Sequence, residues 1–279
     1  MPDKLDKIGD SLIQHGEENR RIYLMKLRDD PKKVIRGMED LAERKQYGKI
    51  FCKVPERAKR PFEEKNYIVE ASIPDFYRGK ETVYFMSKFL NPLRKKMNTE
   101  IRDKVKSNLA LARSKMKSKT ALSVPSDYKI KRLKTPQMPV LAKLYDSIYE
   151  TYPFPITDAA YLLKTLQSHI DYFGVFDRER LIAASSAEKD VKTGNAEMTD
   201  FATLPDYRGK GLATALLSRM ERDISGEDIG TLYTIARALS PGMNITFARC
   251  GYKYSGTLVN NTQIFGRIEP MNVWYKHVG

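Results

Sequence analysis

The stretch Arg208-Gly-Lys-Gly-Leu-Ala213 lies between a run of strand-forming residues, 197–203, and a helical pattern, 211–224. Glycines there let the backbone approach an anion closely. The first turn of the helix then presents unpaired N–H groups and the positive end of the helix dipole. Such a turn predicts a pyrophosphate ligand. A glycine-rich turn also occurs between strands and helices that bind nothing, so the interpretation depends on the residues around it.

Around this turn the apolar pattern predicts strands and helices in the order β-α-α-β-β-β-α-β-α-β-β from Tyr128 onward. The expected strands are 128–133, 172–176, 181–187, 197–203 and 232–236, the expected helices are 139–149, 158–168, 211–224 and 241–250, and a hairpin closes the chain. This order is typical of a mixed α/β sheet flanked by helices, of the α/β or α+β class.

The residues before 128 divide into two parts. Up to residue 90, strands are predicted at 21–27, 49–54, 67–73 and 82–88, with helices at 30–44 and 56–66. Between Asn91 and Lys119, ten Lys or Arg residues oppose Glu100 and Asp103, which gives +8 of the net charge of +14. Apolar residues recur there at helical spacing, which predicts an amphipathic helix with a solvated basic face. We therefore divide the chain into an N-terminal α/β region (1–90), a basic linker helix (91–124) and a C-terminal domain (125–279).

The bulk composition limits the function classes. Because the positive charge is concentrated on one predicted helix, nucleic-acid binding is not expected. Cys52 and Cys250 do not make a disulfide framework, and His15, His169 and His277 have no metal-ligand spacing, so no metal is expected. No apolar run approaches the roughly 18 residues of a membrane span, and the start does not resemble a secretory signal. We expect a cytoplasmic protein without membrane contact; the sequence leaves homodimerisation open.

These features resemble the GNAT superfamily of N-acetyltransferases. Its signature is Arg or Gln, two residues, Gly, one residue, then Gly or Ala, and Arg208, Gly211 and Ala213 occupy those places. A helix opened by Ser240-Pro241 ends in Gly251-Tyr252, as the fourth helix of that family does. The resemblance implies acetyl-CoA as co-substrate, its pantetheine arm pairing with the end of the strand before the turn. The residues that it places on the cofactor are Phe201, Ala202, Thr203, Arg208, Gly209, Lys210, Gly211, Leu212, Ala213, Asn244 and Phe247.

A narrower resemblance covers most of the chain. Residues 252–261 and 269–276 are similar to the ending of the β-lysine N-acetyltransferases, and 7–15, 21–26 and 72–77 are similar to other parts of that family. This resemblance implies acetyl transfer to the terminal (N6) amine of β-lysine, 3,6-diaminohexanoate. The product, Nε-acetyl-β-lysine, is a compatible solute in salt-stressed cells. Two alternatives stay open: a protein or peptide N-acetyltransferase, and a non-catalytic regulator that binds acyl-CoA.

The acceptor amine needs a base. A lysine-type amine has a pKa of about 10.4, so it is protonated at neutral pH and the site must accept its proton. Glu197 is the first candidate, because it lies eleven residues before Arg208, where the histone-acetylating branch of the family keeps its base. Asp200 is the second candidate. Strand alternation puts the two on opposite faces, so only one should line the site unless a bulge intervenes.

The thioester needs two kinds of support. Backbone N–H groups near residues 201–203 are expected to hold its carbonyl oxygen. Many family members protonate the leaving thiolate with a Tyr four residues before the helix-closing glycine, but this chain has Phe247 there. Tyr252 and Tyr207 are the candidate substitutes, and unaided departure of the thiolate is the alternative. Cys250 is expected to be a packed core cysteine rather than an acyl-enzyme nucleophile.

A free amino acid as acceptor also brings a carboxylate, which Arg binds in a bidentate fashion. Arg237 and Arg249 are the candidates. The aromatic and proline loop 152–156, with Tyr152 and Phe154, is expected to cover the acceptor, although it could equally be a turn packed by its own aromatic residues.

The N-terminal region shows a weak internal similarity to the C-terminal domain. Residues 62–67, Phe-Glu-Glu-Lys-Asn-Tyr, correspond to 247–252, Phe-Ala-Arg-Cys-Gly-Tyr, and two strands follow each. We interpret residues 21–90 as a degenerate half of a GNAT domain, with convergent patterning as the alternative. Because no glycine lies between Leu27 and Val34, this region should not bind CoA. It would extend the sheet or wall the acceptor pocket.

Overall fold

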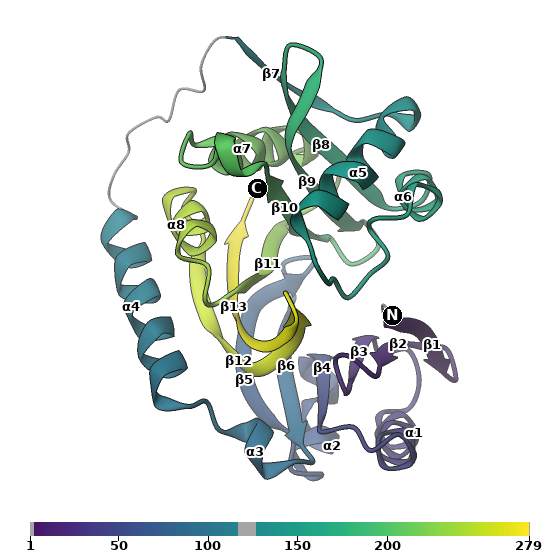
Figure 1. Cartoon of the computed structure of the whole chain (residues 1–279). Helices are drawn as coiled ribbons and strands as arrows, with labels where there is room; N and C mark the ends of the chain where they lie inside the picture. The colour runs from purple at the N-terminus through teal and green to yellow at the C-terminus, as the bar shows by residue number, and fades with distance from the viewer. Residues whose placement is uncertain (1–2, 117–126, 279) are drawn as a thin grey trace.

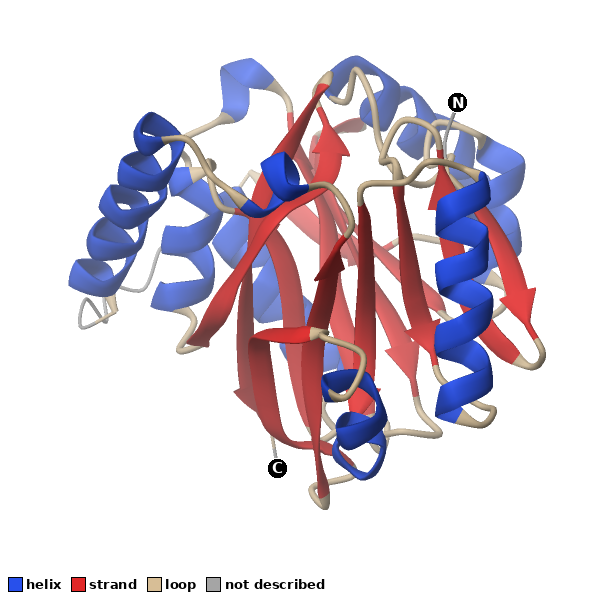
Figure 2. Ribbon diagram, turned by 90° about the horizontal axis from the view of Figure 1, so that it is seen from below, coloured by secondary structure: helices blue, strands red, loops and turns tan. Residues whose placement is uncertain are grey.

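The computed structural model describes residues 3–116 and 127–278, and within them the strands form two mixed sheets with helices around them (Figures 1 and 2). The N-terminal sheet has the order β1-β2-β3-β4-β6-β5. Its strands are β1 (Lys4–Ile8), β2 (Ser11–Gly16), β3 (Arg21–Lys26), β4 (Lys49–Pro55), β5 (Ile68–Tyr77) and β6 (Glu81–Phe89). Its helices are α1 (Pro31–Arg44) and α2 (Lys59–Glu63), the latter preceded by a 3₁₀ turn.

The C-terminal sheet has the order β12-β13-β11-β10-β9-β8-β7. Its strands are β7 (Tyr128–Arg132), β8 (Ile170–Asp177), β9 (Arg180–Asp190), β10 (Asn195–Thr203), β11 (Thr231–Arg237), β12 (Lys253–Ile264) and β13 (Arg267–His277). Its helices are α5 (Met138–Ile148), α6 (Ala159–Leu166), α7 (Leu212–Ile224) and α8 (Pro241–Arg249). The predicted element order of this half and the mixed α/β fold are confirmed.

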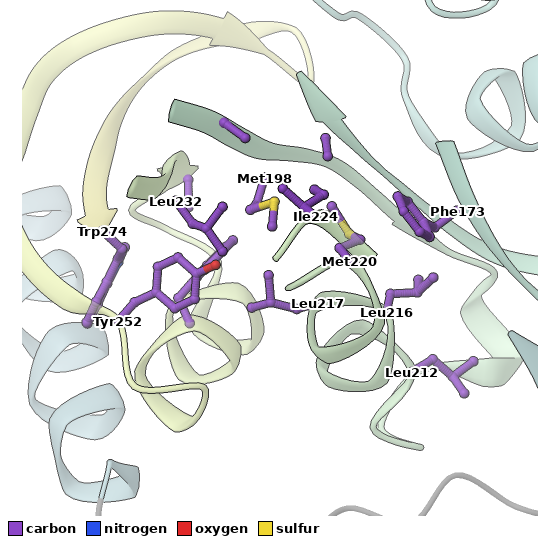
Figure 3. Packing of buried hydrophobic residues seen from close by; sticks show 14 of the residues in the cluster. Phe173, Met198, Leu212, Leu216, Leu217, Met220, Ile224, Leu232, Tyr252 and Trp274 are labelled. Atoms are coloured by element: carbon purple, nitrogen blue, oxygen red, sulfur yellow. The ribbon is translucent and has the colours of Figure 1, made fainter. Parts of the chain in front are cut away.

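Helix α7 anchors the core of the C-terminal half. Its residues at helical spacing, Leu212, Leu216, Leu217, Met220 and Ile224, are buried against side chains from the sheet and from α8 (Figure 3). Full burial of one such side chain stabilises the fold by about 1.5–3 kcal/mol. This stripe therefore fixes the helix on the sheet and holds its N-terminus at the end of β10.

The basic stretch forms two helices, α3 (Pro92–Lys95) and α4 (Thr99–Lys115). The side chain of Asn98 caps α4 by accepting a hydrogen bond from the Ile101 N–H at 2.8 Å, which starts a new helix there. Helix α4 lies beside α8 (Figure 1), with Val105 and Ala112 buried, and the Asn108 amide donates to the Ala238 carbonyl at 3.0 Å. The predicted end of this helix and the linker, 117–126, lie outside the described residues. None of the described helices is long and apolar enough to span a membrane.

The two sheets repeat one arrangement. The succession β3-α1-β4-α2-β5-β6 matches β10-α7-β11-α8-β12-β13 in strand order and direction, including one parallel pair in each, β3/β4 and β10/β11. The register of the terminal hairpin shifts between Val69 and Ala71 in one half and between Tyr254 and Gly256 in the other. Both positions are offset by the same spacing (254 − 69 = 256 − 71 = 185). The fold is thus consistent with a duplicated GNAT-like arrangement.

The halves contact each other where β5 crosses β12. Ser255 Oγ donates to the Ser72 carbonyl at 2.6 Å and accepts from the Ser72 N–H at 2.9 Å. A Cβ on Gly256 would lie 2.1 Å from the Glu70 carbonyl oxygen, so only glycine allows this crossing. Beside it, an apolar cluster joins the two sheets through side chains such as Phe51, Phe85, Tyr233 and Leu258.

A buried ion pair reinforces the same crossing. Lys49 Nζ lies 2.8 Å from Glu70 Oε2, and both side chains are almost fully buried. The same Nζ donates to the Val259 carbonyl at 2.8 Å, while Glu70 Oε1 accepts from the Val259 N–H at 2.6 Å. One ion pair therefore links the N-terminal sheet to the backbone of β12.

The turn before α1 occupies the place that the glycine-rich turn occupies before α7, but it carries acidic residues. The Asp30 carboxylate caps α1 by accepting from the Lys33 N–H at 3.0 Å, and Asp29 accepts from the Ser11 N–H at 3.0 Å. The Asp30 carboxylate thus takes a first-turn donor that a phosphate would need, and the charges of Asp29 and Asp30 oppose an anion. We expect no CoA binding at this turn.

Candidate functional site

The main cleft opens where β10 and β11 separate. Their parallel pairing ends at Glu197 and Tyr233, although the strands continue to Thr203 and Arg237. The space between them is a cavity of about 600 Å³. Its walls come from the end of β10, the glycine-rich turn, the end of β11, helix α8 and the aromatic residues after α5. Unpaired strand edges of this kind offer backbone hydrogen bonds to an extended ligand.

A β-bulge distorts β10 within this cleft. The register between β10 and β9 shifts between Thr199 and Ala202, and Asp200 has a φ of 55°, which is strained for a residue other than glycine. The bulge breaks the alternation that would send Glu197 and Asp200 to opposite faces. Both side chains now line the same second cavity, described below.

The glycine-rich turn is built to receive an anion. Gly209 and Gly211 have φ values of 78° and 75°, and α7 begins immediately after Gly211, without a side-chain cap from the described residues. The first-turn N–H groups therefore lack intrahelical partners and face the cleft, which Leu212 and Ala213 also line. Arg208 is exposed beside them, with its Nε donating to the Thr203 carbonyl at 3.3 Å.

The change Gly209→Val tests this turn. We expect it to weaken CoA binding at least tenfold, because a branched side chain at φ 78° distorts the donors that hold the pyrophosphate. Gly226→Val is a matched control, since Gly226 also has a positive φ, 111°, and open space around it, but lies after α7 and away from the turn. Isothermal titration calorimetry with CoA gives both affinities. Equal affinities for the two variants would remove the turn from the binding site.

A second cavity, of about 100 Å³, lies between the N-terminal and C-terminal halves. The N-terminal sheet contributes side chains from β2, β3 and β4, namely Gln14, Arg21, Tyr23, Met25, Phe51 and Lys53. The C-terminal half contributes Glu188, Glu197 and the loop that contains Tyr152 and Phe154. The two cavities share wall residues, which are Tyr152, Thr199, Asp200, Ile235, Ile264 and Met271. The main cleft and the second cavity therefore meet at the bulge of β10.

Glu197 has the electrostatics of a base. Burial raises the pKa of its carboxyl to about 7, against the attraction of Lys53, and the neighbouring carboxylate of Glu188 raises it further. Lys53 comes from the N-terminal sheet, and its Nζ donates to Tyr233 Oη at 3.0 Å. Burial lowers the pKa of Lys53 despite the attraction of Glu197. A carboxylate with a pKa near neutrality accepts a proton efficiently at that pH.

Asp200 is held by hydrogen bonds. Its Oδ1 accepts from Tyr152 Oη at 2.6 Å, and its Oδ2 accepts from the Ser186 hydroxyl. Burial raises the pKa of Asp200, while the bonds from Ser186 and Tyr152 lower it. Close by, Tyr149 Oη donates to the Phe201 carbonyl at 2.7 Å. No sequence pattern marks Tyr149 as functional, although it stands at the end of the helix that leads into the aromatic loop.

The predicted cofactor residues fall into two groups. The cleft is lined by Phe201, Thr203, Arg208, Gly209, Gly211, Leu212, Ala213 and Phe247. Ala202 faces the core, and Lys210 is exposed beside the turn, with its Nζ 3.4 Å from Tyr128 Oη. Asn244 is buried, donates to the Arg237 and Ser240 carbonyls, and accepts from Trp274 Nε1 at 2.9 Å. Its amide holds α8 against β11 and β13, and its contact with the cofactor stays a prediction.

The predicted substitute acids lie in different places. Tyr252 is fully buried in the core beside Trp274 (Figure 3), with its ring 5.1 Å from that of Phe247, and it does not line the cleft. Tyr207 lines the cleft, but its hydroxyl donates to Asp177 at 2.9 Å. Tyr149 also lines the cleft, and Tyr152 lines both cavities; burial raises the pKa values of both hydroxyls and keeps them protonated.

Cys52 and Cys250 are both free thiols. Burial raises the pKa of Cys250 to about 11, so its thiol is a poor nucleophile at neutral pH. Cys52 is fully buried within the N-terminal core. Among residues 3–116 and 127–278, no group of three or more His, Cys, Asp or Glu side chains is placed to hold a metal ion.

The two arginines predicted to bind the acceptor carboxylate line the cleft and not the second cavity. Arg237 is already paired, through Nε and Nη2, with both oxygens of Glu269 at 2.9 Å. The arginine that lines the second cavity is Arg21, which sequence reasoning did not single out. The predicted loop does lie there, since Tyr152 and Phe154 form part of the wall.

Comparisons with known proteins agree with this geometry. Residues 141–252 match the model of the Acetyltransferase (GNAT) family. The chain is 40% identical over 279 residues, 98% of each chain, to a Beta-lysine N(6)-acetyltransferase of Methanococcus maripaludis. It is 30% identical to a protein of the same name from Methanosarcina mazei, over 86% of this chain and 95% of the other. It is also 29% identical to N-acetyltransferase YodP of Bacillus subtilis, over 96% of each chain.

Proposed function

Because the chain belongs to the acetyltransferase (GNAT) family and is thus an acetyl-CoA-dependent N-acetyltransferase, we propose that its acceptor is the N6 amine of β-lysine. The product would be N6-acetyl-β-lysine, a compatible solute. One observation carries the proposal: the cofactor cleft joins, at Asp200, a small cavity between the two halves that contains both carboxylates and cations. The near full-length identity to β-lysine acetyltransferases supports the same acceptor.

The charges in the second cavity suit β-lysine. Three carboxylates, Glu188, Glu197 and Asp200, face it together with two cations, Arg21 and Lys53. At neutral pH β-lysine carries two ammonium groups and one carboxylate, and a pocket that holds both carboxylates and cations offers a partner of opposite sign to each of them. Because this cavity lies between the two halves of one chain, it suits a small molecule better than a peptide, which would need an open groove.

The reaction follows from these positions. The thioester lies in the cleft, with its carbonyl oxygen held by backbone N–H groups of residues 201–203. Glu197 takes one proton from the N6 ammonium, directly or through a water molecule, and the free amine attacks the thioester carbon. When the tetrahedral intermediate collapses, the C–N bond stays, the C–S bond breaks, and the second amine proton goes to the departing thiolate. Tyr152 orients Asp200 beside this point through its 2.6 Å hydrogen bond.

The first test is CoA-thiol release from acetyl-CoA with β-lysine, α-lysine and a lysine-containing basic peptide as parallel acceptors. We expect the kcat/KM for β-lysine to be at least about tenfold above that for α-lysine. A pocket that binds two charged groups of the acceptor distinguishes substrates in which the distance between these groups differs. The peptide should give no release above hydrolysis. Release with the peptide alone would refute the proposed acceptor. CoA binding without release to any of the three would indicate a non-catalytic CoA-binding protein.

A further inference from the structure

Arg21, at the start of β3, is a buried cation without a full set of partners. Only 3% of its surface is exposed. Its Nη1 donates to the Asn261 carbonyl at 2.6 Å and to Thr262 Oγ1 at 2.9 Å, whereas its Nε has no hydrogen-bond partner among the described residues. Within the described residues its hydrogen bonds go to Asn261 and Thr262 rather than to a carboxylate, and the charge of Asp3 attracts it without a hydrogen bond or ion pair. A buried guanidinium without a counterion is unfavourable, which points to an anionic ligand.

Two uncharged acceptors beside Arg21 also lack partners. Gln14 Oε1 and Asn261 Oδ1 are both buried and, within the described part of the chain, receive no hydrogen bond. Both side chains line the same cavity as Arg21. The Gln14 amide is fixed by donating to the Pro153 carbonyl at 3.1 Å, so its oxygen has a set direction. The residues that line this cavity therefore include a cation with an unused N–H donor and two side chains with unused acceptors.

The same cavity also holds carboxylates that lie away from Arg21. Those of Glu197 and Asp200 line it but are not among the charges that act on the pKa of Arg21, and the cavity meets the cofactor cleft at Asp200. A ligand with a carboxylate and a nearby ammonium at one end, and a second ammonium at the other, matches this layout in one orientation. In that orientation the distant ammonium lies at the bulge of β10.

We propose that Arg21 binds the carboxylate of the acceptor, and that Gln14 and Asn261 accept hydrogen bonds from the ammonium beside it. This inference rests on the proposed function and deepens it, because it assigns acceptor specificity to the N-terminal half of the chain. The N-terminal sheet forms one wall of the acceptor pocket. This gives it a function although it has no glycine-rich turn for a cofactor. Arg21 makes the enzyme select amino acids over diamines of the same length.

The test compares β-lysine with 1,4-diaminopentane, which is β-lysine without its carboxylate, on the wild type, Arg21→Met and Arg21→Lys. Wild type should prefer β-lysine by about 100-fold in kcat/KM, the usual effect of one buried charged hydrogen-bonded pair. Arg21→Met should lower kcat/KM for β-lysine by roughly 100-fold, mainly through KM, and leave the diamine unchanged or improved. For Arg21→Lys we expect a kcat/KM for β-lysine between those of the wild type and Arg21→Met, because lysine keeps the charge but not the planar guanidinium. Arg36→Met, on the exposed face of α1, is the matched control and should leave both substrates unchanged.

The ratio of the kcat/KM values for the two substrates distinguishes a change in specificity from a loss of folding. A variant that is merely destabilised loses both activities together and keeps the ratio. If Arg21→Met does not fold, Arg21→Lys is the deciding variant. Its ratio of kcat/KM for β-lysine to kcat/KM for 1,4-diaminopentane should be at least about tenfold smaller than that of the wild type. An unchanged ratio in a folded Arg21 variant overturns this inference and leaves the proposed function standing. If wild type acetylates neither compound, the proposed function is overturned, and this inference with it.

Discussion

Glu197→Gln is expected to lower kcat for β-lysine by about 100- to 10,000-fold, the usual contribution of a positioned general base. The amide keeps the shape of the side chain but cannot take the proton of the N6 ammonium. The fold should survive, because burial already penalises the charged carboxylate and raises its pKa to about 7, so a neutral side chain costs no more. Thermal unfolding should therefore show no loss of stability.

Glu188→Gln is the matched control for this change. Glu188 lines the same cavity, and its change to Gln also replaces a carboxylate by an amide. Its strand, β9, lies one strand further from the cofactor cleft than β10 does. We expect it to lower kcat less than about tenfold. CoA-thiol release at saturating concentrations of both substrates measures both variants. If the Glu188 variant loses as much as the Glu197 variant, the cavity needs its total charge and Glu197 has no special role.

The pH dependence of kcat/KM in the wild type should show the ionisation of the Glu197 carboxyl. Because burial raises the pKa of Glu197 to about 7, kcat/KM should fall about tenfold per unit below that pH, where the carboxyl is protonated. Glu197→Gln should lack this limb. The stability effect has a definite sign: the folded protein holds this proton between pH 4.5 and about 7 while the unfolded chain loses it. The contribution of Glu197 to stability therefore falls as pH rises through that window.

Lys49→Met is expected to lower the free energy of unfolding by about 3–5 kcal/mol, because it leaves the Glu70 carboxylate buried without its cation. Glu70 would keep hydrogen bonds from the Ser87 hydroxyl and from the Val259 N–H, but not a counterion. Acetyl transfer should also fall, because the pair holds the crossing of β5 and β12 on which the shared cavity depends. Chemical denaturation with circular dichroism gives the stability of each variant.

Two comparisons make this measurement decisive. The double change Lys49→Met with Glu70→Leu should recover most of the loss, because replacing a buried ion pair by apolar residues is often close to neutral. Arg60→Met breaks an exposed pair with Glu64, 2.9 Å apart on one helix, and should change stability little. If Lys49→Met were no worse than Arg60→Met, the pair would not hold the two halves together.

The element order and the cofactor turn were predictable because their signals are local. A stripe of leucines fixes α7, and the glycines before it require a backbone that other residues rarely adopt. β1 and β2 were not predicted. The residues of β1 are largely exposed and polar, and β2 mixes buried polar side chains such as Gln14 and His15 with apolar ones, so neither shows the alternation of a half-buried strand.

The acceptor pocket was not predictable, because its wall joins residues that are far apart in the chain. Arg21 and Lys53 lie more than 100 residues before Glu197, and no local pattern brings β3 and β4 onto the face of β10 and β11. The arginines chosen from the sequence were close to the cofactor motifs instead. Asn244 and Tyr252 were chosen because they lie near a motif, whereas the buried partners of their side chains are visible only in the structure.

The position of the acetyl group on the product shows which way the acceptor binds. Incubating the enzyme with β-lysine and acetyl-CoA labelled with ¹³C in the acetyl group, followed by NMR of the product, identifies the acetylated nitrogen. With the carboxylate held at Arg21 and the far ammonium at the bulge of β10, we expect label on N6 alone. Label on the amine next to the carboxylate would show that the acceptor enters in the opposite orientation, and the absence of labelled β-lysine would contradict the assigned acceptor itself.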